Sequence, residues 1–384
     1  MVIYNSMILW VAFWGLLYHF MHRNSSLAVS SDHQLTPSDK DDNRVSLAFC
    51  ILLMGYIVFW AAVRSGVADS YAYIQIYKDY PDSLSEISKY WGVGGKAPGF
   101  DTFSIIIKSL FSKDYHLWFA IIAIMSGIPV MITLRNKSVN YVYSVFLFMT
   151  MLHFSWFFNG MRQFLVVTIL FYCSKLIEKK KTLSFIIVTA LLSTFHLSAL
   201  ILIPIYFIIQ GKPFGKRIIL FIFLILVAVL LVDQFVVSLD SLLEDTAYAG
   251  TATQIAEDNG VNPLRFLVML VPPALAFIKR KELEQINNHY INICINMSVI
   301  CAGLYFLGMF SSGVFIGRLP IYFELYNLIL LPFLIEKCFE LKWKQLLYIL
   351  SSIGYLLFYV LTFNWHYISD ITGFIDSNVW WFKL

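Results

Sequence analysis

Charged side chains are scarce in this sequence: Asp, Glu, Lys and Arg make up 14% of its 384 residues, whereas apolar residues make up 59%. A soluble domain carries roughly 25% charged residues. Because one soluble core could not enclose so much apolar surface, we expect lipid to be the solvent for most of the chain. The formal net charge is only +4, and basic residues form no stripe outside the flanks of apolar runs. This pattern argues against a nucleic-acid partner.

The sequence also lacks the usual signatures of disulfides, metal sites and cofactors. Its five cysteines lie in or beside apolar runs without CxxC or Cys/His spacing, so we interpret them as small apolar residues. No paired-carboxylate metal box, Gly-rich phosphate loop or Ser/His/Asp order stands out, and we expect no metal and no cofactor. The cysteines are Cys50, Cys173, Cys294, Cys301 and Cys338.

Long apolar runs dominate the rest of the chain. A bilayer core about 30 Å thick needs about 20 apolar residues of helix, and the runs predict an all-α transmembrane bundle of about ten or eleven spanning helices in one domain, residues 1–384. Met1–Phe20 lacks the basic start and cleavage site of a signal peptide, so we expect it to span. The predicted spans are 2–20, 45–63, 117–134, 139–157, 160–177, 218–236, 263–278, 290–310, 320–335 and 345–363.

The basic residues between runs predict the orientation, because cytoplasmic loops are enriched in Lys and Arg. Clusters such as Lys179–Lys181 and Lys279–Lys281 would be cytoplasmic. The N-terminus and the C-terminal tail 364–384 would then lie outside, with three outer loops at 64–116, 237–262 and 311–319.

This layout holds only if the apolar run 182–210 does not cross the membrane, because both of its flanks are basic. Two arms of about 14 residues would each be about 20 Å long as helix, too short to span. We therefore expect a broken or re-entrant hairpin with His196 near its tip. The alternative is one tilted helix with an exception to the orientation rule.

The outer loop 64–116 is too long for a plain connector. In its later part Phe100, Phe103, Ile107 and Leu110 recur at helical spacing, with Lys108 among the opposite polar residues. This spacing predicts an amphipathic helix. It would lie along the outer membrane interface or, alternatively, pack on the bundle.

Polar residues at the predicted outer ends of spans are the candidates for chemistry, because charge within a membrane is costly. Arg64 and Asp69 follow one span and could bind an anion and act as a base; the alternative is a snorkelling arginine. Asn159, Arg162 and Gln163 open another span. An arginine in the first turn of a helix opposes the helix dipole unless an anion binds there; the alternative is a capped, snorkelling helix start.

Two further segments contribute candidates. His196 could face an outward cavity, or it could be a hydrogen-bonded structural residue. Arg318 lies near Tyr322 and Glu324, and the alternative for it is a structural ion pair with Glu324. Arg265 and Asp233 also lie near outer ends, but each stands alone. Since arginine suits phosphate, the residues alone predict a membrane protein with an outer site for an anionic ligand.

These segments resemble the EpsG family of Wzy-like bacterial polysaccharide polymerases, over about residues 45–335. The combination of Asn-Gly-x-Arg-Gln with a later Phe-His-x-Ser-Ala is fairly specific. Two segments depart from the family. Val67-Ala68 replace the usual Gly-Thr, and Ala97 stands where a Glu is common, so we assign no role to that Glu. The matching pieces are Arg64, Asp69–Tyr73, Pro98–Phe100, Asn159–Gln163, Phe195–Leu200, Arg318 and Tyr322-Phe323.

The resemblance implies a metal-independent glycosyltransferase of the bacterial inner membrane. Such an enzyme moves a growing glycan from undecaprenyl diphosphate to the non-reducing end of a lipid-linked repeat at the periplasmic face. Arg162 and Arg318 would stabilise the diphosphate, and Asp69 or His196 would accept the proton. The remaining substrate-binding candidates are Arg64, Tyr73, Asn159, Gln163 and Tyr322.

Membrane lipid, a chain-length regulator and a flippase are the further partners that the resemblance implies. The rival functions are a lipid-linked oligosaccharide flippase, an O-antigen ligase, a sugar O-acyltransferase and a non-enzymatic scaffold. A flippase would need polar residues on both sides of the membrane and internal symmetry, and the sequence shows neither.

Overall fold

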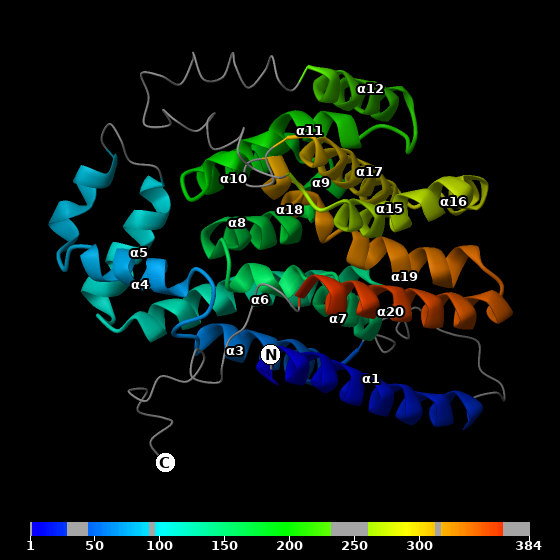
Figure 1. Ribbon diagram of the computed structural model, residues 1–384, viewed down its shortest axis with the longest axis horizontal. Helices are drawn as coiled ribbons and strands as arrows, with labels where there is room; N and C mark the ends of the chain where they lie inside the picture. The colour runs from blue at the N-terminus through cyan, green and yellow to red at the C-terminus, as the bar shows by residue number, and fades with distance from the viewer. Residues whose placement is uncertain (1, 29–44, 92–96, 232–259, 312–315, 364–384) are drawn as a thin grey trace. The chain divides into compact units, whose positions relative to one another are not determined.

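The computed structural model describes residues 2–28, 45–91, 97–231, 260–311 and 316–363. Every regular element in these ranges is a helix, which confirms the all-α class (Figure 1). Asp233, nearly all of the predicted loop 237–262 and the tail 364–384 lie outside the described residues.

The chain divides into two compact units. One comprises Met1–Leu84, Ser104–Tyr172 and Tyr348–Leu384, and the other comprises Ser85–Phe103 and Cys173–Leu347. They are called unit 1 and unit 2 below. The boundary passes through two helices, η1 (Leu84–Trp91) and α5 (Pro98–Leu110). The prediction of a single membrane domain stays a prediction.

Unit 1 is built around α6, which packs against α3 and α8. Gly127 of α6 allows the close approach of α3, because a Cβ there would lie 2.3 Å from a methyl carbon of Val58. The helices of this unit are α1 (Val2–Ala28), α3 (Leu47–Ala62), α4 (Ser70–Asp79), α6 (Tyr115–Lys137), α7 (Tyr141–Thr150), η2 (His153–Phe157), α8 (Met161–Tyr172) and most of α20 (Leu341–Phe363).

Unit 2 is built around α17 (His289–Met309), which is buried on nearly all sides by α12, α15, α18 and α19. Asn296, in the middle of α17, donates hydrogen bonds from its amide nitrogen to the carbonyls of Ile209 and Gly211, which ties α17 to the end of α11. The other helices are α9 (Ser174–Glu178), α10 (Thr182–Ser193), η3 (Leu197–Ile201), α11 (Leu202–Ile209), α12 (Lys216–Leu230), α15 (Pro263–Ile278), α16 (Arg280–Ile286), η4 (Ile316–Arg318), α18 (Ile321–Glu324) and α19 (Asn327–Cys338).

Within the described ranges, four helices are long and apolar enough to cross a bilayer, and a fifth crossing is possible through the pair Ile316–Glu324 and Asn327–Cys338, which is bent by 48°. Other predicted spans form shorter helices. The run 139–157 breaks at Leu152, whose φ is 67°, and the run 160–177 breaks at Cys173. Crossing by these shorter helices stays a prediction.

The run 182–210 is broken, and its two arms fold back on each other. Helix α10 ends at Ser193, and the chain is extended at His196 before η3 and α11. The start of α10 meets α11, because the Thr182 and Tyr206 hydroxyls lie 2.7 Å apart and the Phe185 ring stacks on Tyr206. The hairpin interpretation is therefore confirmed, and the single tilted helix is not.

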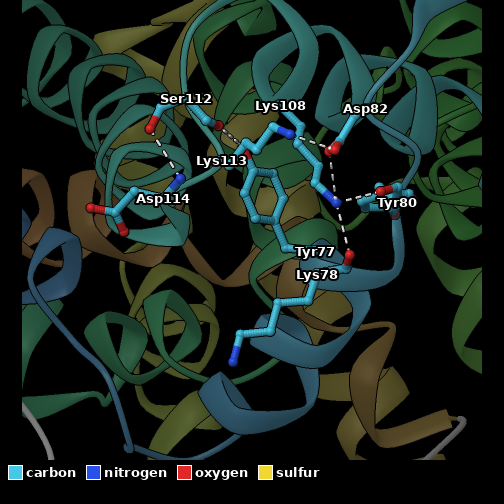
Figure 2. Close-up of polar contacts among 8 residues, drawn as sticks. All are labelled: Tyr77, Lys78, Tyr80, Asp82, Lys108, Ser112, Lys113 and Asp114. Atoms are coloured by element: carbon cyan, nitrogen blue, oxygen red, sulfur yellow. Dashed lines mark hydrogen bonds and ion pairs between the residues drawn. The ribbon is translucent and has the colours of Figure 1, made fainter.

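Helix α5 forms as predicted, with Ile107 buried, but Lys108 and Leu110 near its C-terminus differ from the predicted faces. Lys108 is 8% exposed, whereas Leu110 is 61% exposed. The Lys108 ammonium donates to the backbone carbonyls of Lys78 and Tyr80 (Figure 2). Those carbonyls lie at the C-terminus of α4, where helical carbonyls lack partners and a cation is favoured. The unpaired carbonyls at the end of α4 therefore hold Lys108 inward. The periodicity of the α5 sequence could not show this interaction, because its partner lies in another helix.

An exposed carboxylate completes this cluster. Asp82 lies 3.4 Å from the Lys108 ammonium and 2.6 Å from the Lys113 ammonium (Figure 2). The hydrogen bond from Lys113 lowers the pKa of the Asp82 carboxyl. Because Asp82 and Lys113 are exposed, the buried bonds of Lys108 make the larger contribution to stability.

Replacing the two lysines separately tests this ranking. Lys108→Met should lower the free energy of unfolding by about 1–3 kcal/mol, because two buried carbonyls lose their donor. Lys113→Met removes the same charge from an exposed pair and should leave the midpoint of thermal unfolding in detergent unchanged. Equal losses in the two variants would contradict the capping role of Lys108.

Candidate functional site

In unit 1, Asp69 joins two segments that are far apart in the sequence. It immediately precedes α4, and its backbone N–H donates to the Phe158 carbonyl at 3.3 Å. Its carboxylate accepts a hydrogen bond of 3.0 Å from the backbone N–H of Gly160, just before α8. The Asp69 carboxylate is therefore held at the positive end of a helix, where negative charge is favoured.

Both segments joined by this hydrogen bond contain a residue in the left-handed backbone conformation. Gly160 has φ +67°, a conformation that glycine adopts without steric cost. Ala68 has φ 50°, which an L-residue adopts at a cost of roughly 1–2 kcal/mol. Strained backbone of this kind persists where the surroundings over-determine it, and here it directs Asp69 toward α8.

Arg64 is fully enclosed by protein and does not snorkel toward solvent. It is 1% exposed, and its guanidinium donates to the Ala61 carbonyl and to the sulfur of Met161. The guanidinium carbon lies 4.2 Å from the centre of the Phe119 ring, a favourable cation–π arrangement. Arg64 thus contacts the first residue of α8, next to Arg162.

Tyr73 of α4 completes the polar group of unit 1. Burial raises the pKa of its hydroxyl, and the neighbouring Arg162 opposes this shift. Unit 1 therefore gathers Arg64, Asp69, Tyr73 and Arg162. The predicted residues Asn159 and Gln163 belong to the same segment, and the Gln163 side chain is buried.

In unit 2, His196 is linked to Tyr322 through Ser198. Nδ1 of His196 lies 2.8 Å from the Ser198 hydroxyl, which lies 3.0 Å from the Tyr322 hydroxyl. Such a chain can orient the imidazole and set which ring nitrogen carries the proton. Ser198 was part of the quoted motif, but no role could be assigned to it from sequence, because its partner Tyr322 lies far along the chain.

The Pro-Gly-Phe segment at the start of α5 supports the hairpin tip. The Gly99 N–H donates to the Thr194 carbonyl at 3.0 Å, and the Phe100 ring packs against Phe195. A Cβ at position 99 would lie 2.1 Å from the Thr194 hydroxyl, so only glycine fits without a rearrangement. The segment thereby fixes the backbone immediately before His196.

Glu324 has two partners that the sequence did not indicate. Its carboxylate is fully buried and contacts Arg265 and Tyr305. The ion pair of Arg318 with Glu324, the structural alternative for Arg318, stays a prediction. The two residues lie in different short helices, η4 and α18, and Glu324 faces α17. Arg318 is exposed at the end of η4. Tyr305 carried no sequence signal, because it lies in a continuously apolar helix.

The arrangement offers two kinds of chemistry. The carboxylate of Asp69 and the imidazole of His196 can accept a proton, and the guanidinium groups can bind an anionic ligand. Six of the predicted site residues belong to unit 1, and His196, Arg318 and Tyr322 belong to unit 2.

Two replacements of Asp69 separate its hydrogen bond from its charge. Asp69→Ala removes the acceptor of the Gly160 N–H and should cost about 1 kcal/mol of stability. Asp69→Asn keeps an acceptor oxygen at the same place and should unfold close to the wild-type temperature. Thermal unfolding in detergent measures both, and an Ala variant as stable as the Asn variant would contradict the docking role.

The sequence profile of the EpsG family matches residues 47–375 of this chain. Searches among curated proteins and among solved structures give no significant match. The matched region contains every candidate residue of both units, including the segments around Asp69, Arg162, His196 and Arg318. Together with the apolar helices, the match indicates a membrane protein of the polysaccharide-polymerase type: the chain belongs to the EpsG family.

Proposed function

We propose that this protein is a glycosyltransferase that polymerises lipid-linked oligosaccharide repeats. The observation that carries the proposal is the position of Asp69, whose carboxylate is held against the backbone N–H of Gly160 near Arg162 and Tyr73. A proton acceptor, a cation and a hydroxyl then stand together in a chain of this family. When an acceptor hydroxyl displaces a diphosphate, the proton acceptor serves the attacking oxygen and the cation serves the departing anion.

The proposed reaction is a single displacement. The acceptor hydroxyl loses its proton to Asp69 or His196, and its oxygen bonds to the anomeric carbon of the donor glycan. The bond from that carbon to the diphosphate oxygen breaks, and undecaprenyl diphosphate leaves as the anion. The growing glycan thereby moves to the non-reducing end of the incoming repeat, without a metal.

The arginines act on the leaving group. Arg162 and Arg318 bind the diphosphate and stabilise the charge that develops on it, an effect worth roughly 3–4 kcal/mol for one well-placed donor. Arg64, held by Phe119 and Met161, supports the start of α8. Asn159, Gln163, Tyr73 and Tyr322 bind glycan hydroxyls or phosphate oxygens.

The proposed setting is the bacterial inner membrane, with the site at the periplasmic face. The substrate is a glycan carried on a polyprenyl lipid, and a flippase and a chain-length regulator are the proposed partners. A ligase or an acyltransferase would share part of this site. A ligase would leave the ladder of lipid-linked chains intact, and an acyltransferase would not alter chain length.

The first test is the lipid-linked glycan profile of cells that lack this protein. The deletion strain should carry single repeats, and the wild-type gene should restore a ladder. Arg162→Ala should reduce polymer by about 10²–10³-fold at equal expression, because one stabilising donor is lost. Arg217→Ala, which removes an exposed arginine from the start of α12, serves as the control and should restore the ladder. A full ladder in the deletion strain would exclude polymerase activity.

A second test identifies the base. Asp69→Asn and His196→Gln keep the size of each side chain and remove the proton acceptor. Loss of the base should lower kcat by about 10²–10⁴-fold, measured with purified protein at saturating lipid-linked repeat. Loss of a positioning group should raise KM more than it lowers kcat. Wild-type kcat in both variants would rule out both residues as the base.

A further inference from the structure

Arg265, Tyr305 and Glu324 form a hydrogen-bonded triad in unit 2. Nε of Arg265 donates to the Tyr305 hydroxyl at 2.9 Å, and Nη2 lies 3.5 Å from Oε1 of Glu324. The Tyr305 hydroxyl also bonds to the same carboxylate oxygen. The three residues come from three helices, α15, α17 and α18. No role in the reaction proposed above has been assigned to any of them.

Burial in the triad is unequal. The Glu324 side chain is 0% exposed, whereas the Arg265 side chain is 21% exposed. A carboxylate this deeply buried needs a permanent partner, and the guanidinium supplies it. The carboxylate is therefore enclosed by protein, whereas part of the Arg265 side chain is exposed.

The triad lies at the same end of α17 as Arg318. The N–H of Val261, just before α15, donates to the Gly308 carbonyl at 2.8 Å. A Cβ built on Gly308 would lie 3.6 Å from Cα of Gly317, the neighbour of Arg318 in η4. Both arginines of this part of unit 2 are thus carried by segments that pack on the C-terminal end of α17.

The position of Arg265 also favours an anion. It lies in the first turn of α15, which begins at Pro263, and the positive end of a helix dipole attracts negative charge. A guanidinium has five N–H donors in a planar fork. Among the described residues, the contacts of Arg265 to side chains engage Nε and Nη2, which leaves donors for a phosphate group.

We propose that Arg265 is a further diphosphate-binding residue and that Tyr305 and Glu324 are its positioning residues. This inference rests on the proposed function for the identity of the ligand, the diphosphate of the lipid-linked glycan. The carboxylate and the phenol hold the guanidinium in one orientation, so that it meets the phosphate oxygens without a loss of side-chain freedom on binding.

The alternative is a buried ion pair that serves the fold alone. A single Arg265→Ala replacement cannot separate the two roles, because it leaves the Glu324 carboxylate buried without its cation and is expected to destabilise the protein strongly. The double replacement Arg265→Met with Glu324→Gln removes both charges together. Neutral residues of similar volume commonly preserve stability at buried ion pairs.

The experiment measures binding of inorganic pyrophosphate to the full-length protein in lipid nanodiscs by calorimetry, with a chelator present. The double variant should unfold near the wild-type temperature and bind pyrophosphate at least about tenfold more weakly, a loss of about 1.4 kcal/mol. Tyr305→Phe keeps the ion pair and should weaken binding less. It should also raise KM for lipid-linked repeat while kcat is held. Arg280→Ala, which removes an exposed arginine just after α15, should bind pyrophosphate as the wild type does.

Wild-type affinity in a folded double variant would overturn the proposal and leave the triad a structural ion pair. If the double variant does not fold, unchanged pyrophosphate affinity and unchanged KM in Tyr305→Phe would overturn it. Absence of pyrophosphate binding by the wild type would also overturn it. Failure of the proposed function is recognised separately, by a full glycan ladder in the deletion strain, and does not depend on the pyrophosphate result.

Discussion

A break in an apolar helix exposes backbone N–H and C=O groups that lipid cannot satisfy, and the protein must provide their partners. The candidate site follows this constraint. Asp69 accepts from the N–H of Gly160, the Thr194 carbonyl accepts from Gly99, and the Gly308 carbonyl accepts from Val261. Each bond lies where a helix begins or ends, and each lies within four residues of one to which we assign a role. Polar groups at these breaks therefore have two roles. They supply the hydrogen-bond partners that the interrupted helices need, and the breaks in turn position the residues of the candidate site.

Buried charge in this chain is handled in three different ways. Arg64 is enclosed by aromatic rings and a carbonyl, Lys108 is enclosed by the carbonyls of a helix end, and Glu324 is enclosed by a phenol and a guanidinium. Around Arg64 and Lys108, fixed dipoles or π-systems replace water, and the carboxylate that pairs with Lys108, Asp82, is exposed. In the third group the buried charge is the carboxylate, and the guanidinium of Arg265 neutralises it. In the proposed reaction the leaving group is an anion, and internal cations of this kind would favour it electrostatically.

Sequence predicted the parts of this structure that depend on local composition. The apolar runs predicted the helices, and the two basic flanks of 182–210 predicted the break near His196 that the structure contains. The segments around Asp69, Arg162, His196 and Arg318 were found from their residues and their resemblance to the family. Their roles remain proposals.

Other features escaped prediction because they depend on partners that are distant in the sequence. The inward orientation of Lys108 is set by the end of α4, and the partner of Glu324 is set by a tyrosine in a uniformly apolar helix. The helix breaks within 139–157 and 160–177 could not be predicted either, because an apolar pattern indicates burial but does not show where a helix is interrupted. The role of Ser198, which links His196 to Tyr322 by hydrogen bonds, could be recognised only from the structure, because Tyr322 lies far along the chain.

The contact between Gly99 and Thr194 bears on the thermodynamics of substrate binding. A hairpin tip held only by its own chain would sample many conformations, and a ligand would have to select one of them at an entropic cost. Here the tip is fastened to the start of α5 by a hydrogen bond, by close backbone approach and by aromatic packing. The ordering of His196 is thus completed when the protein folds. In the proposed reaction, the lipid-linked glycan would therefore meet an imidazole whose conformational entropy has already been lost.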